Sequence, residues 1–417
     1  LSPYTARLSG ATGGTIPKLF ATGCRREEQR TLPARNARQM GYALAGLGDT
    51  RVLTATRDGH TGCHWCPVDC RHWHWVDADY APDGRDRFLD DFEPTYALFA
   101  MLDLTPDDAS FNGQLKLLDE VNRRLILPIE QMGCDVMDVG IGLAALFEGL
   151  ARGLVPTDDV PPALAERVRT GDGSGDLEAA VIAVNLMREG MGTTPGVGTT
   201  PGVGTTPGAG EDYPALAALG DGPQGLAARY PAMQDVVYTC GPGTLGNAGH
   251  SNALWTFLMP FSRFFSHYSG QIYKIDETLP SPPDDEALRA VFERVVARMF
   301  DREYFGILCN ALSNCAFTFV IFSQDGNGEQ LDDADLLVRT LAEYGIRTTR
   351  DDLMWFAQAF WAQSIDLKQQ YGWRPPAAAD LPQRVYEGLS LVMDQPISEL
   401  MRWMDMLIDV WRAQAAK

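Results

Sequence analysis

The stretch at residues 62–70 reads Gly-Cys-His-Trp-Cys-Pro-Val-Asp-Cys, and its cysteines are Cys63, Cys66 and Cys70. Thiolates at this C-x2-C-x3-C spacing can reach three corners of one metal cube from a single short loop. The fourth thiolate must then come from elsewhere in the chain, so the metal would hold two distant segments together. The spacing therefore predicts a metal centre that organises the fold, and it favours a [4Fe–4S] cluster.

A structural zinc site is the alternative interpretation of the same stretch. Four of the six histidines crowd it, namely His60, His64, His72 and His74, so a site with three cysteines and one histidine is chemically reasonable. Zinc motifs usually come as two separated pairs of ligands, whereas three cysteines that end in an x3 gap are typical of iron–sulfur proteins. Both interpretations stay open on spacing alone.

Composition and charge exclude several classes of protein. The 417 residues are 45% hydrophobic and 22% charged, which is typical of globular chains and long enough for two or three domains. The net charge of −20 argues against binding a nucleic acid or an anionic membrane. There is no apolar run of ~20 residues for a membrane span and no signal-like start, so we expect a cytoplasmic protein without a disulfide framework.

Hydrophobic periodicity predicts a mainly α protein. Apolar residues recur at helical spacing over 111–153, with stops at Gly133 and Gly153, and again near 177–189, 284–300, 332–344 and from 396 onward. We predict a first domain over 1–190 that carries the cysteine motif and a second over 213–417. Between them, residues 191–212 hold a hexapeptide repeat, Gly-Thr-Thr-Pro-Gly-Val, which we interpret as a surface insertion or linker.

The run Cys63-x2-Cys66-Pro67-x2-Cys70 resembles the cluster motif of the aldehyde ferredoxin oxidoreductase family, which are tungsten or molybdenum bis-pterin enzymes. Further segments resemble the family in the same order along the chain: Leu32-Pro33-Ala34-Arg35-Asn36, Glu130 to Asp135, Gly140 to Gly153, Asn310 to Cys315, Tyr371-Gly372-Trp373, and Asp380-Leu381-Pro382-x-Arg384. The matches together span most of the chain.

The resemblance implies that Cys63, Cys66, Cys70 and Cys315 hold one [4Fe–4S] cluster. Cys309 is the rival fourth ligand, ranked second because it precedes the matching turn. The remaining cysteines, Cys24, Cys134 and Cys240, are expected to be ordinary small apolar residues.

The resemblance also implies two turns beside a pterin. The first comprises Glu130, Gly133, Cys134 and Asp135, and the second Asn310, Ser313 and Asn314. A helix end closed by glycine lets the backbone approach a flat heterocycle, while an acidic side chain accepts hydrogen bonds from its ring. Glu130 and Asn310 replace aspartates of the family pattern and Ser313 replaces a glycine. Gly133 and Ser313 are also explained as plain helix ends.

Three residues are candidates for acid–base work by the same resemblance. Tyr96 precedes Ala97-Leu98-Phe99-Ala100 where the family has a glutamate, and its unperturbed pKa near ~10 makes it a different catalyst. His267 lies at the better spacing before Cys315, whereas His250 sits among glycines and small polar residues. Packing or structural roles explain each of them equally well.

The resemblance implies a fold of two helical lobes like the family's second and third domains. It also implies that the protein oxidises an aldehyde to a carboxylic acid, or catalyses the reverse reaction, and transfers electrons to a ferredoxin-like partner. The family's N-terminal domain would come from a second polypeptide, unless the chain is a fragment or has abandoned the pterin. An open face would then expose an apolar patch. The alternative function is a pterin-free iron–sulfur electron-transfer or scaffold subunit of a larger complex.

Overall fold

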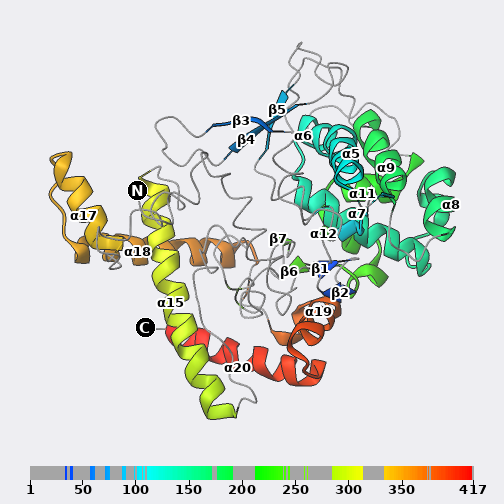
Figure 1. Cartoon of the computed structure of the whole chain (residues 1–417). Coiled ribbons are helices and arrows are strands. Elements are labelled where there is room, and N and C mark those ends of the chain that lie inside the picture. Colours follow the sequence, from blue (N-terminus) through cyan, green and yellow to red (C-terminus); the bar gives the residue numbers. More distant parts are fainter. Residues whose placement is uncertain are drawn as a thin grey trace.

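The computed structural model describes the chain in part, and Figure 1 shows these parts in colour. The described residues are 33–34, 38–40, 57–61, 71–75, 87–90, 98, 101–105, 107–108, 110–170, 176–190, 212–237, 239–240, 243–244, 258, 261, 284–312, 333–372, 374 and 377–415. Within them the chain is mainly helical, as the sequence predicts.

The block predicted over 111–153 is helical, and it includes one π-helical segment. α5 (Phe111–Val121) continues into a π-helix, η4 (Asn122–Ile126), then α6 (Leu127–Gln131), and α7 (Val136–Ala151) follows after a turn. The side chain of Ser110 accepts a hydrogen bond from the Gly113 amide at 3.2 Å and so caps the start of α5.

α7 is the buried centre of the first group of helices. Around it lie α8 (Pro162–Thr170), α9 (Leu177–Gly190), α11 (Pro214–Leu219) and α12 (Gly222–Arg229), with 3₁₀ turns η5 (Thr157–Asp159) and η6 (Pro231–Met233). A Cβ on Gly142 would lie 2.3 Å from a methyl carbon of Leu219, so the missing side chain of Gly142 lets this methyl group of α11 pack directly on α7. Helices from beyond the hexapeptide repeat thus pack on α7.

A second group of helices surrounds an aromatic core. It comprises α15 (Asp285–Ala311), α17 (Asp333–Glu343), α18 (Arg350–Gln370), η10 (Ala378–Asp380), α19 (Gln383–Met393) and α20 (Ile397–Ala415). The ring centroids of Phe300 and Trp361 lie 5.0 Å apart, and those of Trp361 and Trp411 lie 6.4 Å apart. These contacts join α15, α18 and α20, and Figure 1 shows α15 crossing both α18 and α20.

α15 is longer than the helix predicted over 284–300. It continues to Ala311 because Phe305, Ile307, Leu308 and Cys309 extend its buried face. α18 and α19 were not predicted. α18 mixes polar and aromatic residues whose helical period is weak, whereas the apolar residues of α19 do recur at helical spacing and could have indicated a helix.

The described strands form three small antiparallel sheets, none of which the sequence predicts. They are β1 (Pro33–Ala34) with β2 (Gln39–Met40), β3 (Arg57–Thr61) with β4 (Arg71–Trp75) and β5 (Arg87–Asp90), and β6 (Thr239–Cys240) with β7 (Gly243–Thr244). Histidine and tryptophan alternate in β4, and such alternation indicates a strand, but a search for helical periodicity does not detect it. No helix among the described residues is long and apolar enough to cross a membrane.

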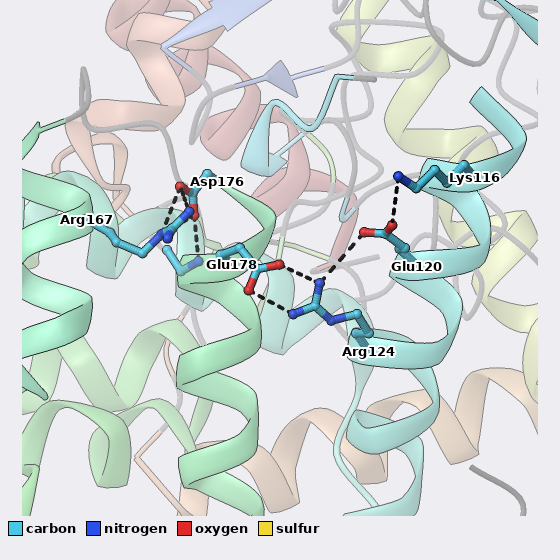
Figure 2. A network of polar contacts seen from close by, with 7 residues as sticks. Lys116, Glu120, Arg124, Arg167, Asp176 and Glu178 are labelled. Carbon is cyan, nitrogen blue, oxygen red and sulfur yellow. Dashed lines mark hydrogen bonds and ion pairs between the residues drawn. The ribbon is translucent and has the colours of Figure 1, made fainter. Parts of the chain in front are cut away.

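A chain of charged side chains ties the start of α9 to its neighbours (Figure 2). Arg124 of η4 forms a bidentate pair with Glu178 of α9 at 2.5 and 2.8 Å, and it approaches Glu120 at 3.7 Å. Arg167 of α8 pairs with Asp176 at 2.6 Å. Asp176 also accepts a hydrogen bond from the Ala179 amide at 2.6 Å, so it fixes both the end of α8 and the start of α9.

Candidate metal and cofactor site

The three cysteines of the predicted cluster motif lie between two paired strands. Thr61, the last residue of β3, is the partner of Arg71, the first residue of β4. Residues opposite each other on antiparallel strands have Cα atoms about 5 Å apart. Cys63, Cys66 and Cys70 themselves lie outside the described residues, but the segment that contains them starts and ends at one point of a sheet.

The histidines of the zinc alternative flank the same connection. His60 of β3 is the register partner of His72 of β4, and His72 in turn is the partner of Asp90 of β5. His64 lies outside the described residues. The described parts of the chain contain no group of three His, Cys, Asp or Glu side chains that could hold a metal ion.

Several predicted site residues lie outside the described part of the chain, namely Tyr96, His250, His267, Ser313, Asn314 and Cys315. Two described residues lie close in sequence to Tyr96 and to Cys315. Leu98, two residues after Tyr96, is buried, and a Cβ on Gly140 of α7 would lie 3.5 Å from it. Leu312, which caps α15, comes three residues before Cys315 and donates its amide to the Leu308 carbonyl at 3.1 Å.

The first predicted pterin turn is a well-formed helix end. Gly133 has φ +74°, its amide donates to the Glu130 carbonyl at 2.9 Å, and the Cys134 amide donates to the Ile129 carbonyl at 3.2 Å. This is the Schellman pattern, and it recurs at Gly153 and Gly345. Gly133 therefore ends a helix, which is the alternative explanation of this glycine that the sequence offers.

The side chains of this turn differ in how available they are. Glu130 is exposed, and a Cβ on Gly133 would meet no atom of the described residues within 4 Å, so no described neighbour covers the backbone there. One carboxylate oxygen of Asp135 already accepts the Asp138 amide at 2.8 Å as the cap of α7. Cys134 is half-buried, and burial raises the pKa of its thiol, which suits an ordinary neutral cysteine.

The second predicted turn begins inside α15. Asn310 lies in the last turn of this helix and is exposed. Cys309 is fully buried in the hydrophobic core, with 0% of its surface exposed. Its thiol is thus part of the hydrophobic core formed by the described residues.

A buried charged centre, which sequence reasoning missed, lies on α7. Glu148 is 1% exposed and pairs directly with Arg384 of α19, which is 5% exposed. Arg152 approaches the same carboxylate at 3.0 Å and Arg38 at 3.8 Å, while Arg384 also contacts Glu387 at 2.8 Å. We call these five residues the Glu148 centre.

Burial and charge act against each other at Arg384. Desolvation lowers the pKa of its guanidinium, and the neighbouring carboxylates of Glu148 and Glu387 oppose that effect. The Arg384 amide donates to the carbonyl of Asp235 at 3.1 Å, which fixes the start of α19 against the segment after η6. The ion pair is therefore held by backbone as well as by side chains.

The Glu148 centre joins two of the segments that carry the family resemblance, and its Arg38 lies near a third in sequence. Arg38 follows residues 32–36, Glu148 lies within 140–153, and Arg384 ends 380–384. A glutamate inside an otherwise apolar helix is the signal that could have revealed the centre, because a buried carboxylate must be paired.

Neither a comparison with known protein families nor one with characterised proteins finds a match for this chain.

Proposed function

We propose that the chain is an iron–sulfur oxidoreductase subunit whose cluster is held by Cys63, Cys66, Cys70 and Cys315. The pairing of Thr61 with Arg71 is the observation that carries this proposal. It closes the base of the segment that contains three cysteines, and a closed loop brings ligands together at a smaller entropic cost than an open chain. Three thiolates on such a loop are three of the four sulfur ligands that a [4Fe–4S] cluster needs.

The burial of Cys309 supports Cys315 as the fourth ligand. Cys309 is 0% exposed and packs in the hydrophobic core, which suits an ordinary small apolar residue. Cys315 comes three residues after Leu312, the C-cap of α15, and lies outside the described residues. A cluster between residues 63–70 and Cys315 would link the strand hairpin to the end of this long helix.

The reaction we propose is the oxidation of an aldehyde, with water, to a carboxylic acid, releasing two electrons and two protons. A tungsten or molybdenum bis-pterin would supply the oxygen transfer and the two-electron step. On this chain, the backbone at Gly133, which no described neighbour covers, and the exposed Glu130 are suited to border a planar ring, whereas Asp135 has one oxygen engaged in capping α7. Tyr96, His267 and His250 are the proposed carriers of protons.

The fold resemblance that accompanies this chemistry is also a proposal. The pairing of Glu148, within 140–153, with Arg384, at the end of 380–384, supports it, because two segments that carry the resemblance lie together although they are far apart in sequence. Arg38, two residues after the segment 32–36, approaches the same carboxylate. A second polypeptide would supply the pterin-binding N-terminal domain, and a ferredoxin-like protein would accept single electrons from the cluster.

A second candidate function is a pterin-free iron–sulfur electron-transfer or scaffold subunit. Two observations favour it: the first turn has the same geometry as the ordinary helix ends at Gly153 and Gly345, and the second turn has Asn310 and Ser313 where an aspartate and a glycine are expected. In this case the same four cysteines bind the cluster, and Glu130 does not border a pterin.

Anaerobic purification with any associated chain retained, followed by elemental analysis for iron, sulfide, tungsten, molybdenum and zinc, separates the two functions. About four iron atoms per chain with stoichiometric tungsten or molybdenum is the result expected for the pterin enzyme. Iron at that level without either metal would favour the electron-transfer subunit. Zinc without iron would contradict both.

A further inference from the structure

The three-stranded sheet of β3, β4 and β5, labelled in Figure 1, gathers histidines on one face. His72 and His74 are two residues apart on the central strand, β4, so they share a face. His60 of β3 is the register partner of His72, and residues opposite each other on antiparallel strands share a face as well. Three of the six histidines of the chain therefore occupy neighbouring positions on one face of the sheet.

A carboxylate lies in the same row. Asp90 of β5 is the register partner of His72 on its other side, so His60, His72 and Asp90 form one row across all three strands. Trp73 and Trp75 alternate with the histidines along β4 and so belong to the opposite face. The strand alternation thus collects the residue types that bind metals on one face and the indoles on the other.

The backbone spacing of the three histidines suits a single ion. Register partners on antiparallel strands have Cα atoms about 4.5–5.5 Å apart, and residues two apart on one strand are separated by about 6.7 Å. His60, His72 and His74 thus form a compact triangle of positions with His72 at one corner. Three imidazoles are a known ligand set for zinc, with zinc–nitrogen bonds of about 2.0–2.1 Å and a fourth tetrahedral position for water.

The register positions beside His74 offer no fourth nitrogen ligand. Arg57 is the partner of His74 on β3, at a β-bulge between Arg57 and Gly59, and Phe88 is its partner on β5. Arginine carries only hydrogen-bond donors and a positive charge, so it does not bind a cation. Asp90 is the carboxylate among the register partners of the three histidines. A carboxylate in this position accepts the second ring N–H of a metal-binding histidine and so fixes its tautomer and orientation.

We propose that His60, His72 and His74 bind one zinc ion and that Asp90 orients His72. These residues are placed by the pairing of strand backbones, and the absence of a metal group among the described side chains does not extend to them. The site differs from the mixed zinc site of three cysteines and one histidine, because it uses no cysteine. It does not rest on the iron–sulfur function, and it leaves the cysteines of residues 62–70 to the cluster.

Zinc titration of the anaerobically purified full chain against a competing chelator tests the ligands. We expect the wild type to bind zinc and His72→Ala to weaken binding by at least about 100-fold, more than an outer residue costs. Asp90→Asn should weaken it by about 10–100-fold, and Asp90→Glu should restore part of that loss. His64→Ala is the matched control, because His64 lies in the cysteine segment and would be a ligand only of the mixed site. It should leave the affinity unchanged.

X-ray absorption at the zinc edge tests the same site without the cluster. In the variant Cys63→Ser with Cys66→Ser and Cys70→Ser, we expect about one zinc ion per chain with nitrogen and oxygen neighbours at about 2.0–2.1 Å. Adding Asp90→Asn should leave that set of neighbours the same, since Asp90 acts through His72. Circular dichroism checks that every variant keeps its helix content, and the histidine variants stand on their own if the serine variant does not fold.

Four results would each overturn the proposal. They are a wild type that binds no zinc, an unchanged zinc affinity in His72→Ala, a loss of zinc in His64→Ala, and a folded serine variant that binds no zinc or has sulfur in its zinc shell at about 2.3 Å. The iron content of the wild type is measured separately, so failure of the zinc site and failure of the cluster are distinguishable.

Discussion

Arginine–carboxylate pairs occur in two settings in this molecule, one buried and one exposed. In the Glu148 centre both partners are almost fully buried, with side-chain exposures of 6% for Arg384 and 2% for Glu148. In the network of Figure 2 the side chains of Arg124 and Glu178 are 28% and 45% exposed, although their geometry is bidentate. We therefore expect burial, more than geometry, to decide how much stability is lost when one partner of each pair is removed.

The largest effect is expected from breaking the buried pair on one side. Glu148→Gln keeps the shape of the side chain but leaves the charge of Arg384 buried with Glu387 as its remaining carboxylate. We expect the free energy of unfolding to fall by about 3–5 kcal/mol. Urea unfolding followed by circular dichroism measures this, and a loss below about 1 kcal/mol would show that water reaches the centre.

Removing both buried charges together should cost less than removing one. Glu148→Leu combined with Arg384→Met replaces the pair by apolar side chains of similar volume, and Arg38 and Arg152 can turn toward solvent. We expect most of the stability lost in Glu148→Gln to return, because no buried charge is left unpaired. The same unfolding assay on the double and both single variants gives the coupling energy, and purely additive losses would contradict this account.

The contribution of the exposed network to stability should depend on pH and on salt. The hydrogen bond from Arg124 lowers the pKa of Glu178. A lowered pKa in the folded state stabilises the protein above the unfolded pKa, and this contribution is lost as the pH falls through the folded pKa.

Glu178→Gln tests that response. We expect it to cost less than about 1 kcal/mol at neutral pH and low salt, and the cost should vanish at acidic pH and shrink at high salt. Unfolding measured across pH and ionic strength checks this. A loss that stays constant across both would mean that the pair acts through packing.

The smallest effect is expected at the outer end of the same network. Lys116 approaches Glu120 at 3.8 Å, and its side chain is 79% exposed. Lys116→Met should change the free energy of unfolding by no more than about 0.5 kcal/mol. A larger loss would indicate that the charges of Figure 2 act as one cooperative unit.

The helices could be predicted from sequence where one face is apolar and an end is marked. Gly133, Gly153 and Gly345 all end helices with positive φ, at the places where the sequence indicates. α18 could not be predicted, because exposed aromatic residues such as Phe356 and Phe360 lie beside its buried residues such as Trp361 and blur the helical period. The strands β3 to β5 are short and contain histidines and arginines that patterning assigns to loops.

The candidate site was predictable only in its local parts. The cysteine spacing is visible in the sequence, but the closure of its flanks by Thr61 and Arg71 depends on strand pairing. The Glu148 centre depends on contacts between residues 38, 148 and 384, and nothing local links these positions. A charged residue in an apolar helix predicts that an oppositely charged partner exists, but the sequence does not identify that partner.

The iron content of two single-cysteine variants, purified anaerobically beside the wild type, tests the central claim most directly. Cys315→Ala should lose the intact cluster and its reduced-state electron paramagnetic resonance signal, because a ligand is removed. Cys309→Ala should keep about four iron atoms per chain and lose only core packing. Retention of the cluster in Cys315→Ala with its loss in Cys309→Ala, or a wild type without iron, would contradict the account.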